Sequence, residues 1–150
     1  MSKEIFTKTQ QEQIVEAIRL AENNTSGEIK VHVEQRCLQP DVLERAKEVF
    51  VTLNLDKTQL RNGVLFYLSI DDRKFAILGD QGIDSRLPEE FWQNTKDTMR
   101  SYFQRGELVE GLSEGIRMAG EQLKELFPYQ QNDINELPDD ISFGGQTSPS

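Results

Sequence analysis

Residues 61–84 read RNGVLFYLSIDDRKFAILGDQGID, and this stretch decides the fold because two apolar runs lie on either side of a short polar link. The run at 64–69 is apolar at almost every position, which is typical of a central strand covered on both faces. The link at 70–74 has hairpin length, so we expect the run at 75–78 to return antiparallel to the first. The sequence therefore predicts a β-hairpin at the centre of a small sheet.

A third strand is expected upstream of the hairpin, at 29–34, where every second residue is isoleucine or valine. Such alternation is the pattern of a half-buried strand. Between this strand and the hairpin, Pro40 and Asp41 suit the start of a helix, and apolar residues recur at helical spacing as far as Leu53. A helix between two strands predicts a crossover that leaves the strands parallel.

Three more helices are predicted from capping residues and apolar periodicity. Thr9 and Glu12 have the spacing of a capping box at the start of the first helix. Another helix is expected over 88–106, opened by a proline and two acids and closed by a glycine. The last is expected over 108–127, where Pro128 stops it.

These elements follow one another as helix, strand, helix, strand, strand, helix and helix. The order predicts an α/β fold, namely a three-layer α/β/α sandwich with a small mixed sheet of three to four strands flanked by helices. We expect one domain at 1–128. The segment 129–150 is rich in Gln, Asn, Asp, Pro, Gly and Ser, and it predicts a largely disordered tail in which 137–143 could dock locally.

Composition limits the classes of partner and cofactor. The 150 residues include 26 acidic and 17 basic ones, for a formal charge of −9, which disfavours nucleic acid and anionic membranes and favours cations. One cysteine and one histidine exclude an intramolecular disulfide and a zinc cluster, so a metal here would be an oxygen-bound one such as calcium, magnesium or manganese. We find neither a signal peptide nor the ~20 consecutive apolar residues of a membrane span, and expect a cytoplasmic monomer.

The predicted topology brings polar residues together at one rim of the sheet. The starts of the strands at 29–34 and 64–69 and the end of the strand at 75–78 should share that rim. Glu28, Asn62, Asp80 and Asp84 would then face a common crevice. Oxygen atoms of these residue types are the ligands that calcium and magnesium prefer, so they form the candidate metal site.

Simpler roles are open for each of these residues. A carboxylate after a strand and beside a glycine, such as Asp80 or Asp84, is an ordinary turn or helix-capping residue. Arg61 could bind a phosphate in bidentate fashion, lower the pKa of a neighbouring carboxylate, or make a surface ion pair. His32 and Cys37 have no nucleophile or base partner nearby in sequence and fit packing or surface roles.

Three short stretches carry a family resemblance: TSGEI at 25–29, RNGVL at 61–65 and AILGDQGI at 76–83. Together they resemble the TPM domain, a family that takes in thylakoid-lumen phosphatase-like proteins, a photosystem repair protein and many bacterial proteins. The resemblance extends from the first helix to Pro128, and NELP at 135–138 is similar to the soluble bacterial branch.

The resemblance implies an α/β/α sandwich, divalent cations (notably calcium) bound at an acidic crevice, and a weak acid phosphatase activity. Two features depart from it. Arg61 stands where many members have an acidic residue, and we expect neither the signal peptide nor the membrane anchor of many members, because the sequence shows no pattern for either.

Two functions follow as alternatives. The first is an accessory or regulatory module in which a calcium or magnesium ion at Glu28, Asn62, Asp80 and Asp84 orders the rim, to be read by an unknown protein partner. The second is a metal-assisted acid phosphatase of low activity, with Arg61 holding the phosphate and Asp80 or Asp84 as the base.

Overall fold

The structure is a computed structural model that describes residues 5–23, 25–37, 39–128 and 141–144. The remaining residues, which include most of the expected tail, lie outside the described part. The helices are α1 (Lys8–Glu22), α2 (Val42–Thr52), α3 (Gln81–Asp84), α4 (Glu89–Gln104) and α5 (Leu108–Leu126), with a 3-10 turn η1 (Leu55–Lys57). The strands are β1 (Glu28–Glu34), β2 (Gly63–Ser69), β3 (Lys74–Gly79) and β4 (Ile141–Gly144).

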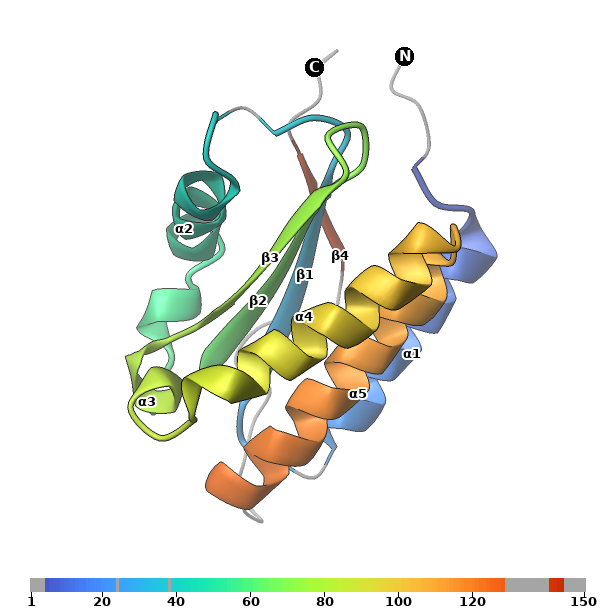
Figure 1. Cartoon of the computed structure of the whole chain (residues 1–150). Helices are drawn as coiled ribbons and strands as arrows, with labels where there is room; N and C mark the ends of the chain where they lie inside the picture. Colours follow the sequence, from blue (N-terminus) through green and yellow to red (C-terminus); the bar gives the residue numbers. More distant parts are fainter. Residues whose placement is uncertain (1–4, 24, 38, 129–140, 145–150) are drawn as a thin grey trace.

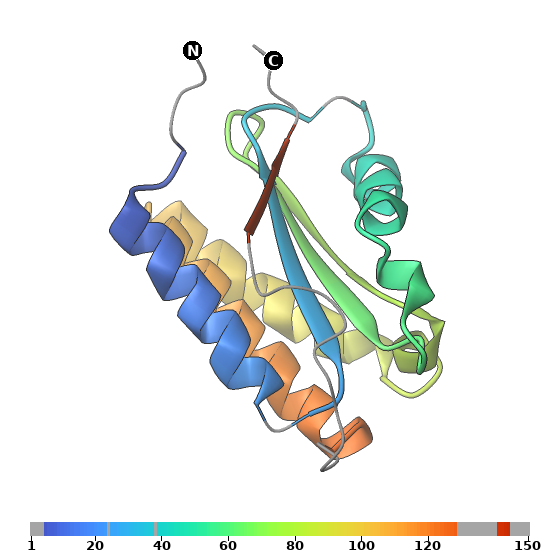
Figure 2. The ribbon, with the colours of Figure 1, turned by 180° about the vertical axis from the view of Figure 1, so that it is seen from behind.

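The sheet has the order β3-β2-β1-β4. β1 runs parallel to β2, and β2 pairs antiparallel with β3, so the predicted crossover and hairpin are both confirmed. β4 adds a fourth strand, parallel to β1, from within the segment expected to be a largely disordered tail. Figure 2 shows this short strand beside β1 at the edge of the sheet. The local docking expected for 137–143 therefore holds for the described residues from Ile141 on.

Helices cover both faces of the sheet, as in the predicted three-layer sandwich. α1, α4 and α5 lie on one face and α2 with η1 on the other, with α5 packed between α1 and α4 (Figure 1). The larger core joins the first helical layer to one set of alternate strand residues, and it includes Val31, Phe66 and Ile116. A smaller core around Phe50, Leu55 and Tyr67 lies under α2.

Helix α1 begins two residues earlier than the expected capping box. Thr7, not Thr9, is the N-cap, and Gln10 takes the place assigned to Glu12. The Gln10 amide donates to the Thr7 hydroxyl at 3.1 Å, while the Gln10 side chain accepts from the Thr7 amide at 2.9 Å. Both pairs have suitable spacing, and the observed box satisfies two of the amides that a helix start leaves unpaired.

Candidate functional site

The three polar stretches meet at one rim of the sheet, as predicted. Glu28 is opposite Gly63 in the β1–β2 register, and Val64 is opposite Gly79 in the β2–β3 register. Backbone hydrogen bonds continue the pairing past the strand ends, from the Glu28 amide to the Asn62 carbonyl at 3.3 Å and from the Asp80 amide to the Gly63 carbonyl at 2.9 Å. The backbone thus places Glu28, Asn62 and Asp80 in one row across the sheet.

Asp80 has two structural partners at this rim. Its carboxylate accepts from Nε and Nη2 of Arg61, at 2.6 and 2.9 Å, and it caps α3 by accepting from the Gln81 amide at 2.8 Å. The hydrogen bonds to Asp80 raise the pKa of Arg61. Both the helix-capping role and the ion pair considered from the sequence are therefore present. Nε and Nη2 of Arg61 both donate to Asp80.

A glycine holds α3 against the loop that carries Arg61. The Gly82 amide donates to the Arg61 carbonyl at 2.9 Å. A Cβ at this position would lie 2.5 Å from the carbonyl oxygens of both Leu60 and Arg61, which is closer than real Cβ atoms approach. Since backbone cannot move aside as a side chain can, glycine is required for this close contact.

Asp84 and Asn62 supply the remaining side-chain oxygens of the rim, and the Trp92 side chain is close enough to hydrogen-bond to Asp84. Asp84 lies one turn after Asp80, and its pKa is raised because partial burial desolvates the carboxylate and the Asp80 charge repels it. Asn62 is buried, and its Nδ2 donates to the Ser26 carbonyl at 3.3 Å. Its Oδ1 is also buried and accepts a hydrogen bond from none of the described residues.

The rim does not present a complete set of metal ligands. Among the described residues, no group of three His, Cys, Asp or Glu side chains is placed to hold a metal ion. Asp80 and Asp84 are close enough for their charges to interact. Asn62 lies between two hydrogen-bond partners of Asp80, namely the Arg61 side chain and the Gly63 carbonyl. Glu28 joins this group through its backbone and is itself buried.

A second polar cluster, which the sequence analysis did not identify, surrounds Glu34 at the other end of β1. Glu34 is fully buried, and its carboxylate accepts from three side chains. Tyr67 Oη donates at 2.6 Å, His32 Nε2 at 2.9 Å, and the Arg45 guanidinium makes several contacts, with Nε 3.1 Å from both carboxylate oxygens. Burial alone would raise the pKa of Glu34, but the hydrogen bonds from His32, Arg45 and Tyr67 outweigh it and lower the pKa to about 2.

His32 extends this cluster to the fourth strand. Its Nδ1 lies 2.9 Å from the Ser142 hydroxyl, and its ring stacks on that of Tyr67 with centroids 6.0 Å apart. Because the Glu34 carboxylate can only accept, Nε2 of His32 carries a proton and donates to it. Serine, histidine and glutamate thus form one chain of hydrogen bonds.

The sequence model of the TPM domain matches residues 2–122 of the chain. The chain belongs to the TPM domain family. The resemblance inferred from the three polar stretches is confirmed, and the α/β sandwich that it implied is the fold observed. A comparison with curated proteins finds none that matches.

Solved structures resemble this TPM domain over most of its length. The NMR structure of the BA42 protein from the psychrophilic bacterium Bizionia argentinensis shares 43% identity, with a TM-score of 0.89 over 96% of this chain and 99% of that one. The N-terminal domain of a P. gingivalis protein has a TM-score of 0.68 at 21% identity, covering 82% of this chain and 79% of its own. The N-terminal domain of a Corynebacterium glutamicum protein has a TM-score of 0.59 at 9% identity, covering 79% and 74%. The last two show similarity of fold alone.

One signal in the sequence could have located the Glu34 cluster in this TPM domain. The polar residues of β1 alternate with its valines, so they all face the α2 side of a sheet that helices cover on both faces. Buried charges need partners, and a long basic side chain on the neighbouring helix is the expected one. Arg45 of α2 has this role.

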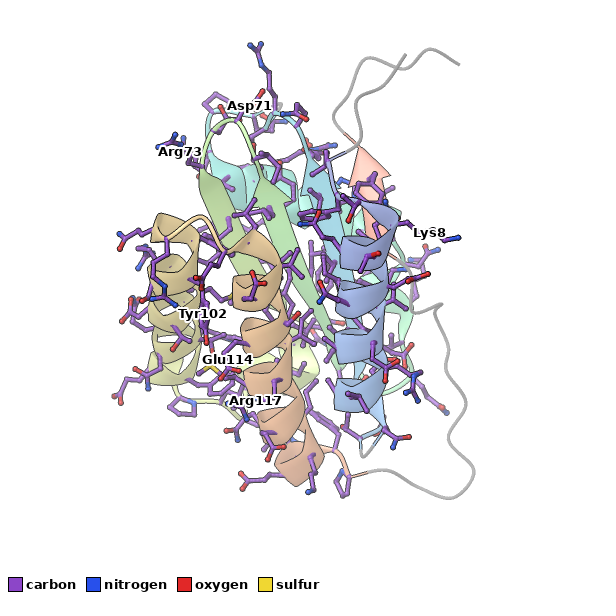
Figure 3. All side chains as sticks on the ribbon, turned by 90° about the vertical axis from the view of Figure 1, so that its right-hand side faces the viewer. Lys8, Asp71, Arg73, Tyr102, Glu114 and Arg117 are labelled. Carbon is purple, nitrogen blue, oxygen red and sulfur yellow. The ribbon has the colours of Figure 1, made fainter. Side chains whose placement is uncertain are left out.

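The helical side of the TPM domain carries exposed charge and a cavity. Figure 3 places Glu114 and Arg117 on α5 and Asp71 and Arg73 at the tip of the β2–β3 hairpin. A cavity of about 490 Å³ is lined by residues of α1 and α5, together with Tyr102 of α4. Within the described ranges, no helix is long and apolar enough to cross a membrane.

Proposed function

We propose that this TPM domain binds a divalent cation, calcium or magnesium, weakly at the rim formed by Asn62, Asp80 and Asp84. The observation that carries the proposal is the buried Asn62 Oδ1, which accepts a hydrogen bond from none of the described residues. A buried acceptor without a donor is costly, and a cation would satisfy it. Glu28, in the same row, is the fourth candidate ligand.

The two carboxylates of α3 support the same proposal. Asp80 and Asp84 repel each other, which contributes to the raised pKa of Asp84. A bound cation would relieve this repulsion and lower the pKa of Asp84, because a nearby positive charge favours the ionised carboxylate. Oxygen-only ligands of this kind suit calcium and magnesium rather than zinc or copper.

Arg61 sets the strength of the site. Its guanidinium neutralises Asp80 from 2.6 Å, so a cation must share Asp80 with it or displace it. Arg61 is more than a third exposed and can move into solvent, whereas Asp80 is buried, so a cation that displaces Arg61 must neutralise Asp80 in its place. The module is therefore proposed to respond to high cation concentrations, as an accessory part that a protein partner reads.

A backbone-amide NMR titration with calcium chloride, repeated with magnesium chloride, tests the proposal. We expect saturable shifts confined to residues near 25–28, 61–63 and 79–85. Asn62→Leu, which keeps the volume of the side chain and removes the oxygen, should abolish them. Arg61→Gln should tighten binding about three- to tenfold by releasing Asp80.

Asp71→Asn is the matched control, because Asp71 is an exposed acid at the tip of the β2–β3 hairpin, away from the rim. It should bind the cation as the wild type does. Shifts that spread over the whole acidic surface, or that persist in Asn62→Leu, would mean non-specific attraction and would refute the site.

Hydrolysis of a phosphomonoester stays the alternative prediction. No contact among the described residues favours it, since Arg61, the residue expected to hold the phosphate, directs two nitrogens at Asp80. Turnover of p-nitrophenyl phosphate that requires the cation and is lost in Asp80→Ala would favour the enzyme.

A further inference from the structure

β4 is a small element with an important position. It has four residues, none of them fully buried, and the Phe143 side chain is 40% exposed. Its partner β1 is buried at every residue. Without β4, the outer edge of β1 would present unpaired amides and carbonyls, which is a template for another extended segment. The edge of β1 is therefore a strand-binding surface, and Ile141–Gly144 fills it.

The surface also recognises side chains. Ser142 is opposite His32 in the register, and its hydroxyl lies 2.9 Å from Nδ1, within hydrogen-bonding distance. The other ring nitrogen is occupied by Glu34, so Nδ1 needs a hydrogen-bond partner from the incoming strand. The hydroxyl of a serine or threonine supplies it, whereas an alanine leaves a buried ring nitrogen unpaired.

The position opposite Glu34 accepts only glycine. A Cβ on Gly144 would lie 2.9 Å from Cε1 and 3.0 Å from Nε2 of His32. The ring has little freedom to move away, because Ser142 and Glu34 hold both nitrogens and Tyr67 stacks on its face.

The two remaining positions have different requirements. Ile141 packs against the larger core, so an apolar residue is favoured there. Phe143 points largely to solvent, and its position can vary. The edge thus fits an extended segment of the form apolar, Ser or Thr, any residue, Gly.

We propose that the outer edge of β1, with His32 as the reading residue, is a binding site for an extended segment of this form in another protein, and that Ile141–Gly144 occupies the site as an internal ligand. The mode is β-strand addition, in which main-chain hydrogen bonds supply affinity and alternate side chains supply specificity. Ile141–Gly144 belongs to the same chain, so the internal ligand competes intramolecularly with any partner. A partner therefore binds when its segment is longer or fits better, or when the internal ligand is removed.

The test uses the full-length chain with Gly144→Val, which forces β4 off His32 and leaves the site itself unchanged. The probe is a fluorescein-labelled peptide of residues 139–146, DDISFGGQ, followed by fluorescence anisotropy. We expect the Gly144→Val chain to bind the peptide at least tenfold more tightly than the wild type does. Phe143→Ala, which changes an exposed side chain of the same strand, is the matched control and should bind as weakly as the wild type.

Two peptides test the recognition of side chains. A peptide with Ser142→Ala should bind the Gly144→Val chain at least tenfold more weakly, and a peptide with Gly144→Val should not bind. Ser142→Pro in the full chain releases β4 by a different route and should open the site in the same way. Circular dichroism of both chains checks that the domain is folded.

Equal binding by the wild type and by both released chains would overturn the proposal, and so would a folded, released chain that fails to bind the peptide below 1 mM. Equally tight binding of the wild-type and the substituted peptides would also overturn it, because His32 would then not discriminate between side chains.

Discussion

Glu34→Gln is the most direct test of how charge is held inside this domain. The substitution keeps the shape of a fully buried side chain and removes its charge. The pKa of Glu34 is lowered from 4.5 to about 2 by its three donors, despite the opposing effect of burial. At about 1.4 kcal/mol per pKa unit, ionised Glu34 contributes about 3 kcal/mol to the free energy of unfolding near neutral pH.

The pH dependence of this contribution has a definite sign. Because the folded-state pKa of Glu34 lies below the unfolded one, the stabilisation is fully present above about pH 4.5 and is lost as the pH falls towards 2. Integrating between those two pKa values, it falls by about 2 kcal/mol between pH 5 and pH 3.

Urea denaturation of the wild type and of Glu34→Gln at pH 5 and pH 3 measures this effect. The difference in unfolding free energy between the two proteins should shrink by about 2 kcal/mol at the lower pH. Other carboxylates titrate in both proteins and cancel in the difference. Glu114→Gln is the control, since Glu114 pairs with Arg117 on the exposed side of α5 and should change stability by less than about 0.5 kcal/mol. A gap between wild type and Glu34→Gln that is independent of pH would refute the reasoning.

Five further substitutions, two of them controls, test the fold by their effect on urea denaturation. Gly82→Ala should cost about 1–3 kcal/mol, because its Cβ would be 2.5 Å from two backbone carbonyl oxygens; an unchanged midpoint would contradict this. Thr7→Ala should cost about 1 kcal/mol and Thr9→Ala nothing, and the reverse order would restore the capping box first expected from the sequence. Ile116→Ala, at a fully buried site, should cost about 2–5 kcal/mol, whereas Leu20→Ala, on the exposed side of α1, should cost less than about 1 kcal/mol.

The central sheet was predictable because local patterns determine it. Alternation located β1, continuous apolarity located β2, and the lengths of the two connections fixed parallel and antiparallel pairing. The convergence of the three polar stretches followed from this topology alone. The capping box was misplaced by two residues because two threonines have glutamine or glutamate three positions later, and sequence spacing does not distinguish them.

The partners of the charged residues were not predictable in the same way. Arg61 and Asp80 were both candidate site residues. Their ion pair, however, depends on the close contact that Gly82 of α3 makes with the loop before β2, which carries Arg61. β4 is four residues long and pairs with a strand more than a hundred residues away in sequence. A run this short, in a segment rich in polar residues, glycine and proline, shows no detectable alternation of apolar and polar residues. Its pairing with β1 is therefore visible only in the assembled sheet.

The two polar clusters have a common origin in β1. Its isoleucine and valines face the larger core, so the four residues that alternate with them, Glu28, Lys30, His32 and Glu34, must face the α2 layer. α2 packs mainly on β3 and β2, so its apolar residues cannot cover β1, and polar groups bury each other there instead. A buried carboxylate with three donors is costly to disturb, which makes His32 a rigid and specific contact for a fourth strand. At the opposite rim the buried Asn62 Oδ1 accepts a hydrogen bond from none of the described residues, which leaves room for the cation that we propose. This difference between the two clusters is the reason we propose strand recognition at one end of β1 and cation binding at the other.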